Sequence, residues 1–411
     1  MSWFYRIDMT KPLVYTLRIY LNYRPYRQIN TVLLHITMNL ILLAIPFFIV
    51  LIAMELAVDR YRGTGYYRMN DSISSLNAGI FSRVTIIFWR LAPVAVYYYV
   101  YQNWSVTELP VSGITWVVAF VSYDFFYYWY HRISHERNLF WAAHVVHHSS
   151  EEYNLTTALR QSSGSLLNWI FYLPMALVGI DPVQMATVAA LNLLYQFWVH
   201  SRHIPKLGWY ENWFVTPSNH RVHHAINDQY IDKNYGGVFI IWDRMFGTYQ
   251  EEQSETPCVY GIRKPLSSWN PVWTNLHHYS LLFKDTWYTK RWSDKVGLWF
   301  AKTGWRPQDV SEQYPLQPFN ITTFKKFDTE LSPFIKAYAL SNLLLIIIGL
   351  GYFMLQSRAI TTSELLSYGA IIYGSCFSLG LILENRRWAL PVEIIRLVII
   401  GTVLQHSSIV V

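Results

Sequence analysis

Long apolar segments recur along the whole chain and are separated by polar loops. The clearest segment, residues 31–58, contains no Asp, Glu, Lys or Arg before Glu55. A membrane-spanning helix needs about 20 consecutive apolar residues, so this segment is long enough to cross a bilayer. Further segments of this kind lie at 81–101, 111–130, 165–180, 183–200, 334–355, 365–383 and 389–411. The pattern predicts an all-α fold and a polytopic integral membrane protein.

Two parts of this pattern leave alternatives open. Segments 165–180 and 183–200 are short and are joined by Gly-Ile-Asp-Pro, which predicts a hairpin that enters the bilayer only partly. Pro46 lies in the middle of segment 31–58, and a proline can kink a helix. That segment is therefore either one span or a re-entrant or double element, and the sequence does not decide between them.

Composition supports a membrane protein. Hydrophobic residues make up 52% of the 411 residues and charged residues only 14%, whereas soluble domains carry roughly 25% charged residues. The net charge of +7 lies in basic loops that suit anionic lipid headgroups. Only two cysteines, far apart in the chain, argue against a disulfide framework or a thiolate metal site. No nucleic-acid-binding motif is present, so we expect a membrane and not a nucleic acid as partner.

Charge in the loops predicts an orientation. The short loop 102–110 has no Lys or Arg and should face away from the cytoplasm. Segment 111–130 then runs inward and places His131 on the cytoplasmic side. Counting back through a single span at 31–58 puts the basic N-terminus outside, so its orientation stays open. We expect three parts: a basic N-terminal segment (1–30), a membrane catalytic domain (31–333) and C-terminal hydrophobic helices (334–411).

Ten of the 14 histidines lie between His131 and His224, and eight of these form three clusters. The clusters have the spacings HxxxH, HxxHH and HxxHH, which put the imidazoles of each cluster on one helical face. Their members are His131, His135, His144, His147, His148, His220, His223 and His224. Imidazole is the commonest side-chain metal ligand. Eight are too many for one ion with four to six ligands, so the clusters predict two metal ions.

Other polar residues are further candidates for binding the metal ions or for supporting their ligands. His200 ends segment 183–200 at the same membrane face and is expected to be a ninth ligand, with His203 as a weaker candidate. Asp124 is a charge inside an apolar segment and is the best candidate to orient a ligand, because metal-bound histidines usually donate to a carboxylate or carbonyl. Weaker candidates for the same orienting role are Glu151, Glu152, Asp232 and Asp243. Asn154, Arg160 and Gln161 are candidates for contact with a headgroup or cofactor, with a structural role as the alternative, and Asn234 is a weaker candidate to approach a metal directly or through water.

These spacings resemble the membrane-bound fatty acid hydroxylase and sterol desaturase superfamily, and so does segment 241–249 (IWDRMFGTY). Within it, several stretches are similar to the alkylglycerol monooxygenases. They are 72–83, 147–161, 193–200, 216–224 and 231–237. The resemblance implies a non-haem di-iron monooxygenase that uses molecular oxygen and tetrahydrobiopterin. It implies hydroxylation of the carbon next to the ether oxygen of an alkylglycerol, which then releases a fatty aldehyde.

The resemblance also implies details of the site. Glu136 would contact the pterin, and zinc can fill such a site in purified protein. The active site would lie on the cytoplasmic side of the endoplasmic reticulum in a eukaryote, or of the inner membrane in a bacterium. Two alternatives stay open: a sterol or fatty acyl desaturase or hydroxylase of the same superfamily, and a non-catalytic metal-binding membrane protein. The sequence does not indicate the oligomeric state.

Overall fold

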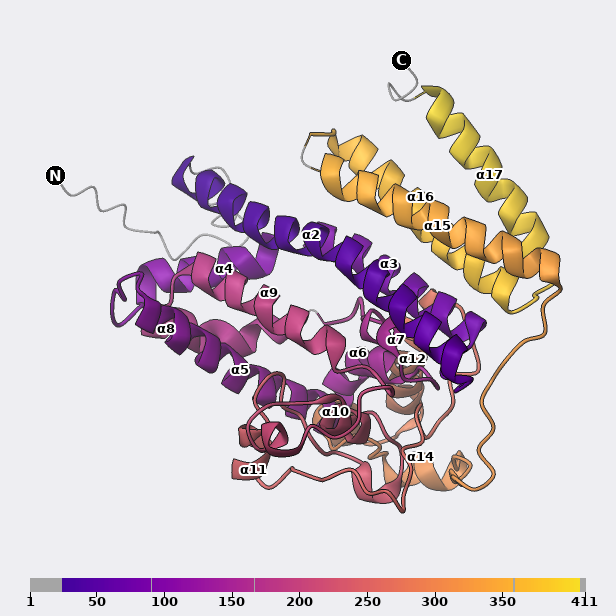
Figure 1. Cartoon of the computed structure of the whole chain (residues 1–411), viewed down its shortest axis with the longest axis horizontal. Helices are drawn as coiled ribbons and strands as arrows, with labels where there is room; N and C mark the ends of the chain where they lie inside the picture. Colours follow the sequence, from indigo (N-terminus) through magenta and orange to yellow (C-terminus); the bar gives the residue numbers. More distant parts are fainter. Residues whose placement is uncertain (1–23, 90, 166, 358, 407–411) are drawn as a thin grey trace.

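The structure, a computed structural model, describes residues 24–89, 91–165, 167–357 and 359–406. In this part of the chain nearly all regular structure is helical, and the two isolated β-bridges form no sheet (Figure 1). The helices are α2 (Arg24–Arg62), α3 (Met69–Trp89), α4 (Leu91–Trp104), α5 (Gly113–Glu136), α6 (Asn138–His148), α7 (Leu155–Ala158), η1 (Asn168–Tyr172), α8 (Leu173–Val178), α9 (Pro182–Trp198), η2 (Gly208–Asn212), α10 (Pro217–His223), η3 (Asp228–Tyr230), α11 (Ile241–Met245), α12 (Pro271–Tyr288), α13 (Trp292–Phe300), α14 (Gln308–Gln313), α15 (Pro333–Gln356), α16 (Thr362–Leu383) and α17 (Ala389–His406). The all-α prediction is confirmed.

By length and composition, two of the described helices can cross a membrane, α15 and α16. A third span exists if α3 and α4, which meet at 47°, are counted as one bent element. The predicted segment 81–101 therefore straddles a bend instead of forming one straight helix. These spans agree with an integral membrane protein.

The expected hairpin at 165–200 is built from short helices. Residues 168–178 form η1 and the six-residue α8, and Gly179 ends α8 with a positive φ of 95°. Asp181 then starts the 17-residue α9 by accepting hydrogen bonds from the amides of Val183 and Gln184. At 1.5 Å per residue α9 is about 26 Å long, less than the roughly 30 Å of a bilayer core. The lengths agree with partial entry into the bilayer.

Helix α2 bears on one of the alternatives at segment 31–58, the double element. It is one continuous helix of 39 residues that contains Pro46, so the segment is not divided into two helices, and its crossing of the membrane stays a prediction. Near its C-terminal end, the buried Glu55 accepts hydrogen bonds from the Leu155 amide and the Ser201 hydroxyl. These contacts tie α2 to the chain that follows the second histidine cluster and to the residue after His200. The predicted N-terminal segment 1–30 lies mostly outside the described residues.

Helix α3 connects the histidine region to the C-terminal helices. Gly79 packs directly on the loop after α7, where an added Cβ would lie 2.1 Å from the Leu159 carbonyl oxygen. On another side, Asn77 donates to the Cys376 carbonyl on α16, and apolar residues of α3, α15 and α16 form one buried cluster. The C-terminal helices thus share a core with α3, and the domain division at 333 stays a prediction.

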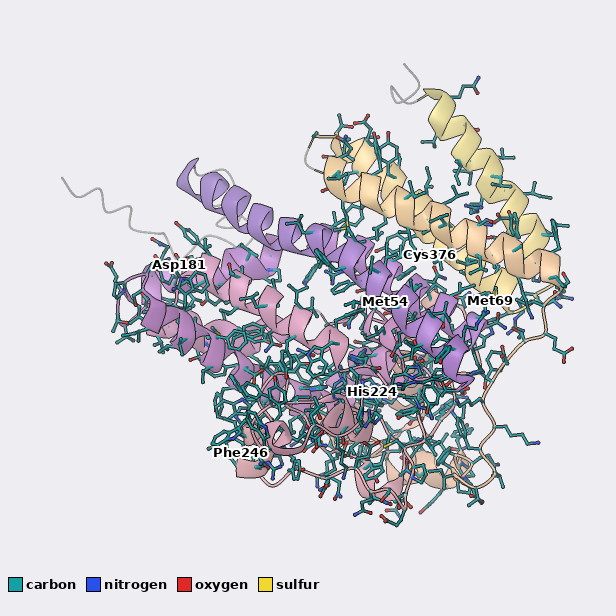
Figure 2. The ribbon with its side chains drawn as sticks, viewed as in Figure 1. Met54, Met69, Asp181, His224, Phe246 and Cys376 are labelled. Carbon is teal, nitrogen blue, oxygen red and sulfur yellow. The ribbon has the colours of Figure 1, made fainter. Side chains whose placement is uncertain are left out.

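The long helices lead to a loop-rich region that contains the histidines. Figure 1 shows α2, α5 and α9 running toward the lower part of the molecule, where α6, α7, α10 and α12 gather. His224 lies at this junction in Figure 2. Helix α5 packs against α6 and α9, and only Arg137 separates α5 from α6. The ends of the helices that carry the histidines are therefore brought together.

Candidate metal centre

Four segments supply nine buried or half-buried histidines. Helix α5 carries His131 and His135 in its last two turns, and α6 carries the second cluster in its C-terminal half. His200 comes two residues after the end of α9, and α10 carries His220 and His223, with His224 directly after its last residue. A Thr216–Asn219 capping box starts α10, with a proline at its first position. This strong start fixes a helix of only seven residues.

The nine histidines divide into two groups. In each group, one nitrogen from every histidine lies within 4.8 Å of all the others. The first group holds His131, His135, His144, His148 and His223, and the second holds His147, His200, His220 and His224. Residues four apart stay together, whereas His147 and His223 join the opposite group from their cluster neighbours. Helices α6 and α10 therefore each contribute to both groups.

Distances between the ring nitrogens fit bound metal ions. The Nε2 atoms of His131 and His144 lie 3.0 Å apart, and those of His144 and His148 lie 3.1 Å apart. In the second group the corresponding distances are 3.1–3.2 Å. Two nitrogens bound to one ion at about 2.1 Å lie about 3.0–3.4 Å apart at bond angles between 90° and 109°. The set of nine imidazoles thus fits two transition-metal ions.

Two further nitrogens support the same interpretation. Nε2 of His135 and Nε2 of His223 are buried and have no hydrogen-bond partner among the described residues. A buried polar atom without a partner is costly. Both atoms belong to the five-histidine group, where a metal ion would supply the missing partner.

Backbone carbonyls orient four of the rings. His131 donates from Nδ1 to the Tyr235 carbonyl at 2.8 Å, and His223 donates to the Lys233 carbonyl at 2.9 Å. His147 and His200 donate in the same way to the carbonyls of Arg160 and Gln196, at 2.9 and 2.8 Å. A proton on Nδ1 leaves the lone pair on Nε2, and in these rings Nε2 faces the other histidines. The carbonyls therefore select the tautomer that a metal requires.

Asp243 holds the loop that presents two of these carbonyls. Its carboxylate accepts hydrogen bonds from the amides of Tyr235 and Gly236 at 2.7 and 2.8 Å, and from the Thr248 hydroxyl at 2.7 Å. Asn234 has a positive φ of 55°. Its side chain is saturated by the backbone of Asn219 and Gln250. Asn234 is therefore part of the loop's support, and its amide is not free to approach a metal.

Asp124 acts on the same loop from α5. It is fully buried and accepts hydrogen bonds from the amides of Val238 and Phe239 and from the Trp242 indole, at 2.8–3.0 Å. It also accepts from Asn192 on α9 at 2.7 Å. Asp124 thus anchors the loop to two helices, and none of its hydrogen bonds among the described residues goes to a histidine. Its influence on the ligands is indirect, which the sequence did not indicate.

Most of the other polar candidates have structural contacts. Glu151 and Glu152 face Arg68, Asn154 caps α7, and the guanidinium of Arg160 donates to the Val146 carbonyl and to serine hydroxyls. Gln161 donates to the Ala158 carbonyl. Asp232 lies 3.8 Å from Nδ1 of His135 and so approaches the five-histidine group.

Two residues near the histidine groups, His203 and Glu136, belong to neither group. Nε2 of His203 lies 3.8 Å from Oδ1 of Asp59 on α2. Glu136 is the last residue of α5 and directly follows His135. Its carboxylate accepts from Arg132 at 2.9 Å and lies 3.5 Å from the Tyr235 hydroxyl. With a third of its side chain exposed, Glu136 remains accessible at the edge of the five-histidine group.

Burial keeps the histidines neutral. Desolvation lowers the pKa of His147 to about 4, although the hydrogen bond to the Arg160 carbonyl opposes this shift. Burial also holds the pKa values of His220, His223 and His224 well below their usual range, and neighbouring histidines add to the effect. Neutral imidazole is the form that binds a metal, so at pH 7 these rings are ready to act as ligands.

Comparisons with known proteins agree with this geometry. The sequence model of the fatty acid hydroxylase family matches residues 116–248, a region that contains all nine histidines, Asp124 and Asp243. No solved structure matches the chain.

Curated relatives cover much more of the chain. Alkylglycerol monooxygenase of Xenopus tropicalis is 38% identical over 356 residues, which is 86% of this chain and 79% of the relative. The Homo sapiens enzyme is 38% identical over 360 residues, 86% of this chain and 80% of the relative. The Danio rerio enzyme is 37% identical over 366 residues, 87% and 80%. The chain therefore belongs to the alkylglycerol monooxygenase family, whose members are membrane oxidoreductases of the fatty acid hydroxylase type.

Proposed function

We propose that the protein is an iron- and oxygen-dependent monooxygenase that cleaves the ether bond of alkylglycerols. In this reaction one oxygen atom of O₂ enters the C–H bond next to the ether oxygen, and the other is reduced to water by two electrons from tetrahydrobiopterin. The resulting hemiacetal breaks its C–O bond and gives a fatty aldehyde and glycerol. The observation that carries the proposal is the division of nine histidines into two groups of five and four, in a chain 38% identical to alkylglycerol monooxygenases.

Two iron ions fit the donor set. The histidine groups contain no thiolate, which disfavours a structural zinc site, and imidazole nitrogen suits iron. Iron, when bound, supplies the activation of O₂ that no side chain can provide. The five-histidine group would hold one ion and the four-histidine group the other. Because burial keeps the imidazoles neutral, they can hold the ions without a competing proton.

The protein groups around the ions supply position. The loop carbonyls of Lys233 and Tyr235 hold His223 and His131, while Asp243 and Asp124 hold the loop. Glu136 would receive the amino groups of the pterin ring, because its partly exposed carboxylate lies beside the five-histidine group. We place this site on the cytoplasmic face of the membrane, since loop 102–110 lacks Lys and Arg.

A reconstituted assay tests the proposal. The purified protein, loaded with iron, is supplied with a 1-O-alkylglycerol, ¹⁸O₂ and tetrahydrobiopterin, and the aldehyde is reduced at once to the alcohol to prevent exchange with water. We expect labelled fatty alcohol only when all three components are present. The variant His144→Ala should give none, because His144 links His131 and His148 in the five-histidine group.

Other outcomes distinguish the alternatives. A new double bond without ¹⁸O in the product would indicate a desaturase. Iron-loaded protein that consumes no oxygen with alkylglycerol, sterol or fatty acyl lipids would indicate a non-catalytic metal-binding protein. Full activity of the His144→Ala variant would contradict the assignment of the site.

A further inference from the structure

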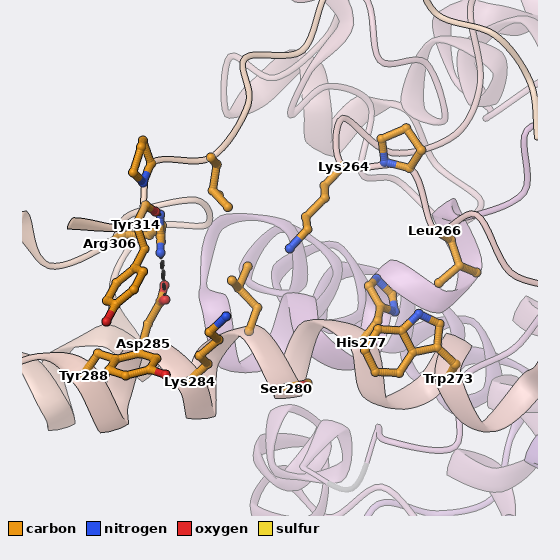
Figure 3. A pocket seen from close by; sticks show the side chains of 14 residues that line it. Lys264, Leu266, Trp273, His277, Ser280, Lys284, Asp285, Tyr288, Arg306 and Tyr314 are labelled. Carbon is orange, nitrogen blue, oxygen red and sulfur yellow. Dashed lines mark hydrogen bonds and ion pairs between the residues drawn. The ribbon is translucent and has the colours of Figure 1, made fainter. Parts of the chain in front are cut away.

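A second site candidate is a cavity of about 310 Å³ beside α12 (Figure 3). Its walls come from α12, from residues 264–266, from Arg306 and from residues 314–316. Small-molecule sites typically have volumes of roughly 300–1,000 Å³. None of the nine histidines is among the described residues that line this cavity. The cavity is therefore separate from the site of the proposed oxidation.

The cavity carries an excess of positive charge. Asp285 and Arg306 neutralise each other through two hydrogen bonds of 2.6 and 2.8 Å. Lys264 and Lys284 have no ion-pair partner among the residues that the structure describes. Figure 3 shows both ammonium groups pointing into the cavity, one from each side. Two uncompensated charges thus face the same space, and both side chains are exposed to solvent, so an anion can reach them.

A buried ring nitrogen adds a polar group to this wall. His277, which lines the cavity, donates from Nδ1 to the Thr274 carbonyl at 2.9 Å. Its Nε2 atom is buried and has no partner in the described part of the chain. Because Nδ1 carries the proton that it donates to Thr274, Nε2 is an acceptor, and a ligand hydroxyl such as that of a monoprotonated phosphate group would satisfy it by donating.

Most of the remaining lining residues, and the neighbouring surface of α12, are apolar or aromatic. Trp273, Leu281 and Leu316 contribute to the walls. The outer face of α12 exposes Leu276, Phe283 and Trp287, the last two by 62% and 82%. With Trp273 they are spaced at i, i+3, i+10 and i+14, which places them on one side of the helix. Exposed apolar and aromatic strips of this kind are typical of surfaces that meet a membrane interface.

We propose that this cavity binds the phosphate group of a membrane phospholipid. Lys264 and Lys284 would act as its counter-charges, and the exposed face of α12 would lie among the lipid headgroups. A lysine ammonium is a suitable partner for phosphate. A free phosphate ion would use the two lysines but would leave the apolar strip uncovered, which is why we favour the lipid. The proposal does not depend on the proposed oxidation.

A titration of the full-length protein tests this site. The detergent-solubilised chain is titrated with phosphatidic acid, and bound lipid is counted by native mass spectrometry; a parallel titration uses inorganic phosphate. A lysine near an anionic lipid surface contributes about fivefold to affinity, so the double variant Lys264→Ala/Lys284→Ala should bind phosphatidic acid about thirtyfold more weakly. The charge-retaining variant Lys264→Arg/Lys284→Arg should keep most of the affinity, which separates charge from folding.

A matched control removes the same charge elsewhere. Lys290, two residues after the end of α12, and Lys302, two residues after the end of α13, are exposed and do not line the cavity. The variant Lys290→Ala/Lys302→Ala should bind phosphatidic acid as the unmodified protein does. Equal losses in both alanine variants would overturn the proposal, because they would indicate unspecific attraction to the basic surface. Inorganic phosphate that binds as tightly as the lipid would also overturn it in favour of a free-anion site.

Discussion

The support that Asp243 gives to the five-histidine group leads to a selective prediction. Its carboxylate accepts from the amides of Tyr235 and Gly236 and from the Thr248 hydroxyl. Burial raises its pKa to about 6, so at pH 8 it is ionised and accepts all three hydrogen bonds. In the variant Asp243→Asn, the amide NH₂ must face at least one of these donors. A buried donor without a partner costs about 1–3 kcal/mol, and the loop should shift.

The shift affects one metal group and spares the other. The loop carbonyls of Lys233 and Tyr235 orient His223 and His131, which both belong to the five-histidine group. The rings of His147 and His200 in the other group are oriented by carbonyls elsewhere in the chain. Loss of such an orienting contact typically weakens metal binding by about 10–100-fold. Asp243→Asn should therefore retain about one iron per chain where the unmodified protein retains two.

Metal analysis after dialysis against a weak chelator measures this difference. Asp228→Asn is the matched control, because Asp228 is almost fully exposed and pairs with Arg263 on the surface; this variant should keep two irons. The argument would be refuted if Asp243→Asn lost both irons equally. It would also be refuted if this variant kept both irons at the highest chelator concentration at which the unmodified protein still keeps two.

Three further predictions concern single residues. Gly79→Ala should destabilise the fold by several kcal/mol, because the new Cβ would lie 2.1 Å from the Leu159 carbonyl oxygen. Thermal unfolding measures this loss. In the control variant Gly349→Ala the new Cβ meets open space on α15, so this variant should be neutral or stabilising. Equal effects of the two alanines would contradict the close packing of α3. The metal-free protein should lose stability as the pH falls below about 6.5, because the histidines of the unfolded chain then bind protons while the buried imidazoles of the folded chain stay neutral. With a folded-state pKa of about 4, His147 alone lowers the free energy of unfolding by about 3 kcal/mol between pH 6.5 and 4. A free energy of unfolding that does not change over this pH range would contradict the prediction. His144→Ala should abolish turnover while circular dichroism shows the helical content unchanged, and loss of the helical signal would instead show that the ring is needed for folding.

The sequence predicted which histidines gather better than it predicted their arrangement. The spacing of each cluster and the place of His200 at the end of an apolar segment led to the nine residues that the structure gathers. The allocation to groups depends on how the ends of α5, α6 and α10 meet, and helical periodicity within one cluster carries no such information. As a result, the crossing of His147 and His223 to opposite groups could not be predicted.

The supporting contacts were also only partly predictable. Asp124 was singled out because it is a charge in an apolar segment, but its partners are backbone amides more than 100 residues away. The predicted segment 81–101 contains a bend of 47° between α3 and α4. Apolar composition alone does not locate such a bend. The tertiary packing of α3 against the loop after α7 and against α16 was likewise invisible in the local pattern.

The central claim is that nine histidines hold two iron ions in groups of five and four. An anomalous difference map, recorded from crystals of the iron-loaded protein at the iron absorption edge, tests it most directly. The account predicts two peaks per chain, one among His131, His135, His144, His148 and His223, and one among His147, His200, His220 and His224. A single peak, or peaks outside these two groups, would contradict it.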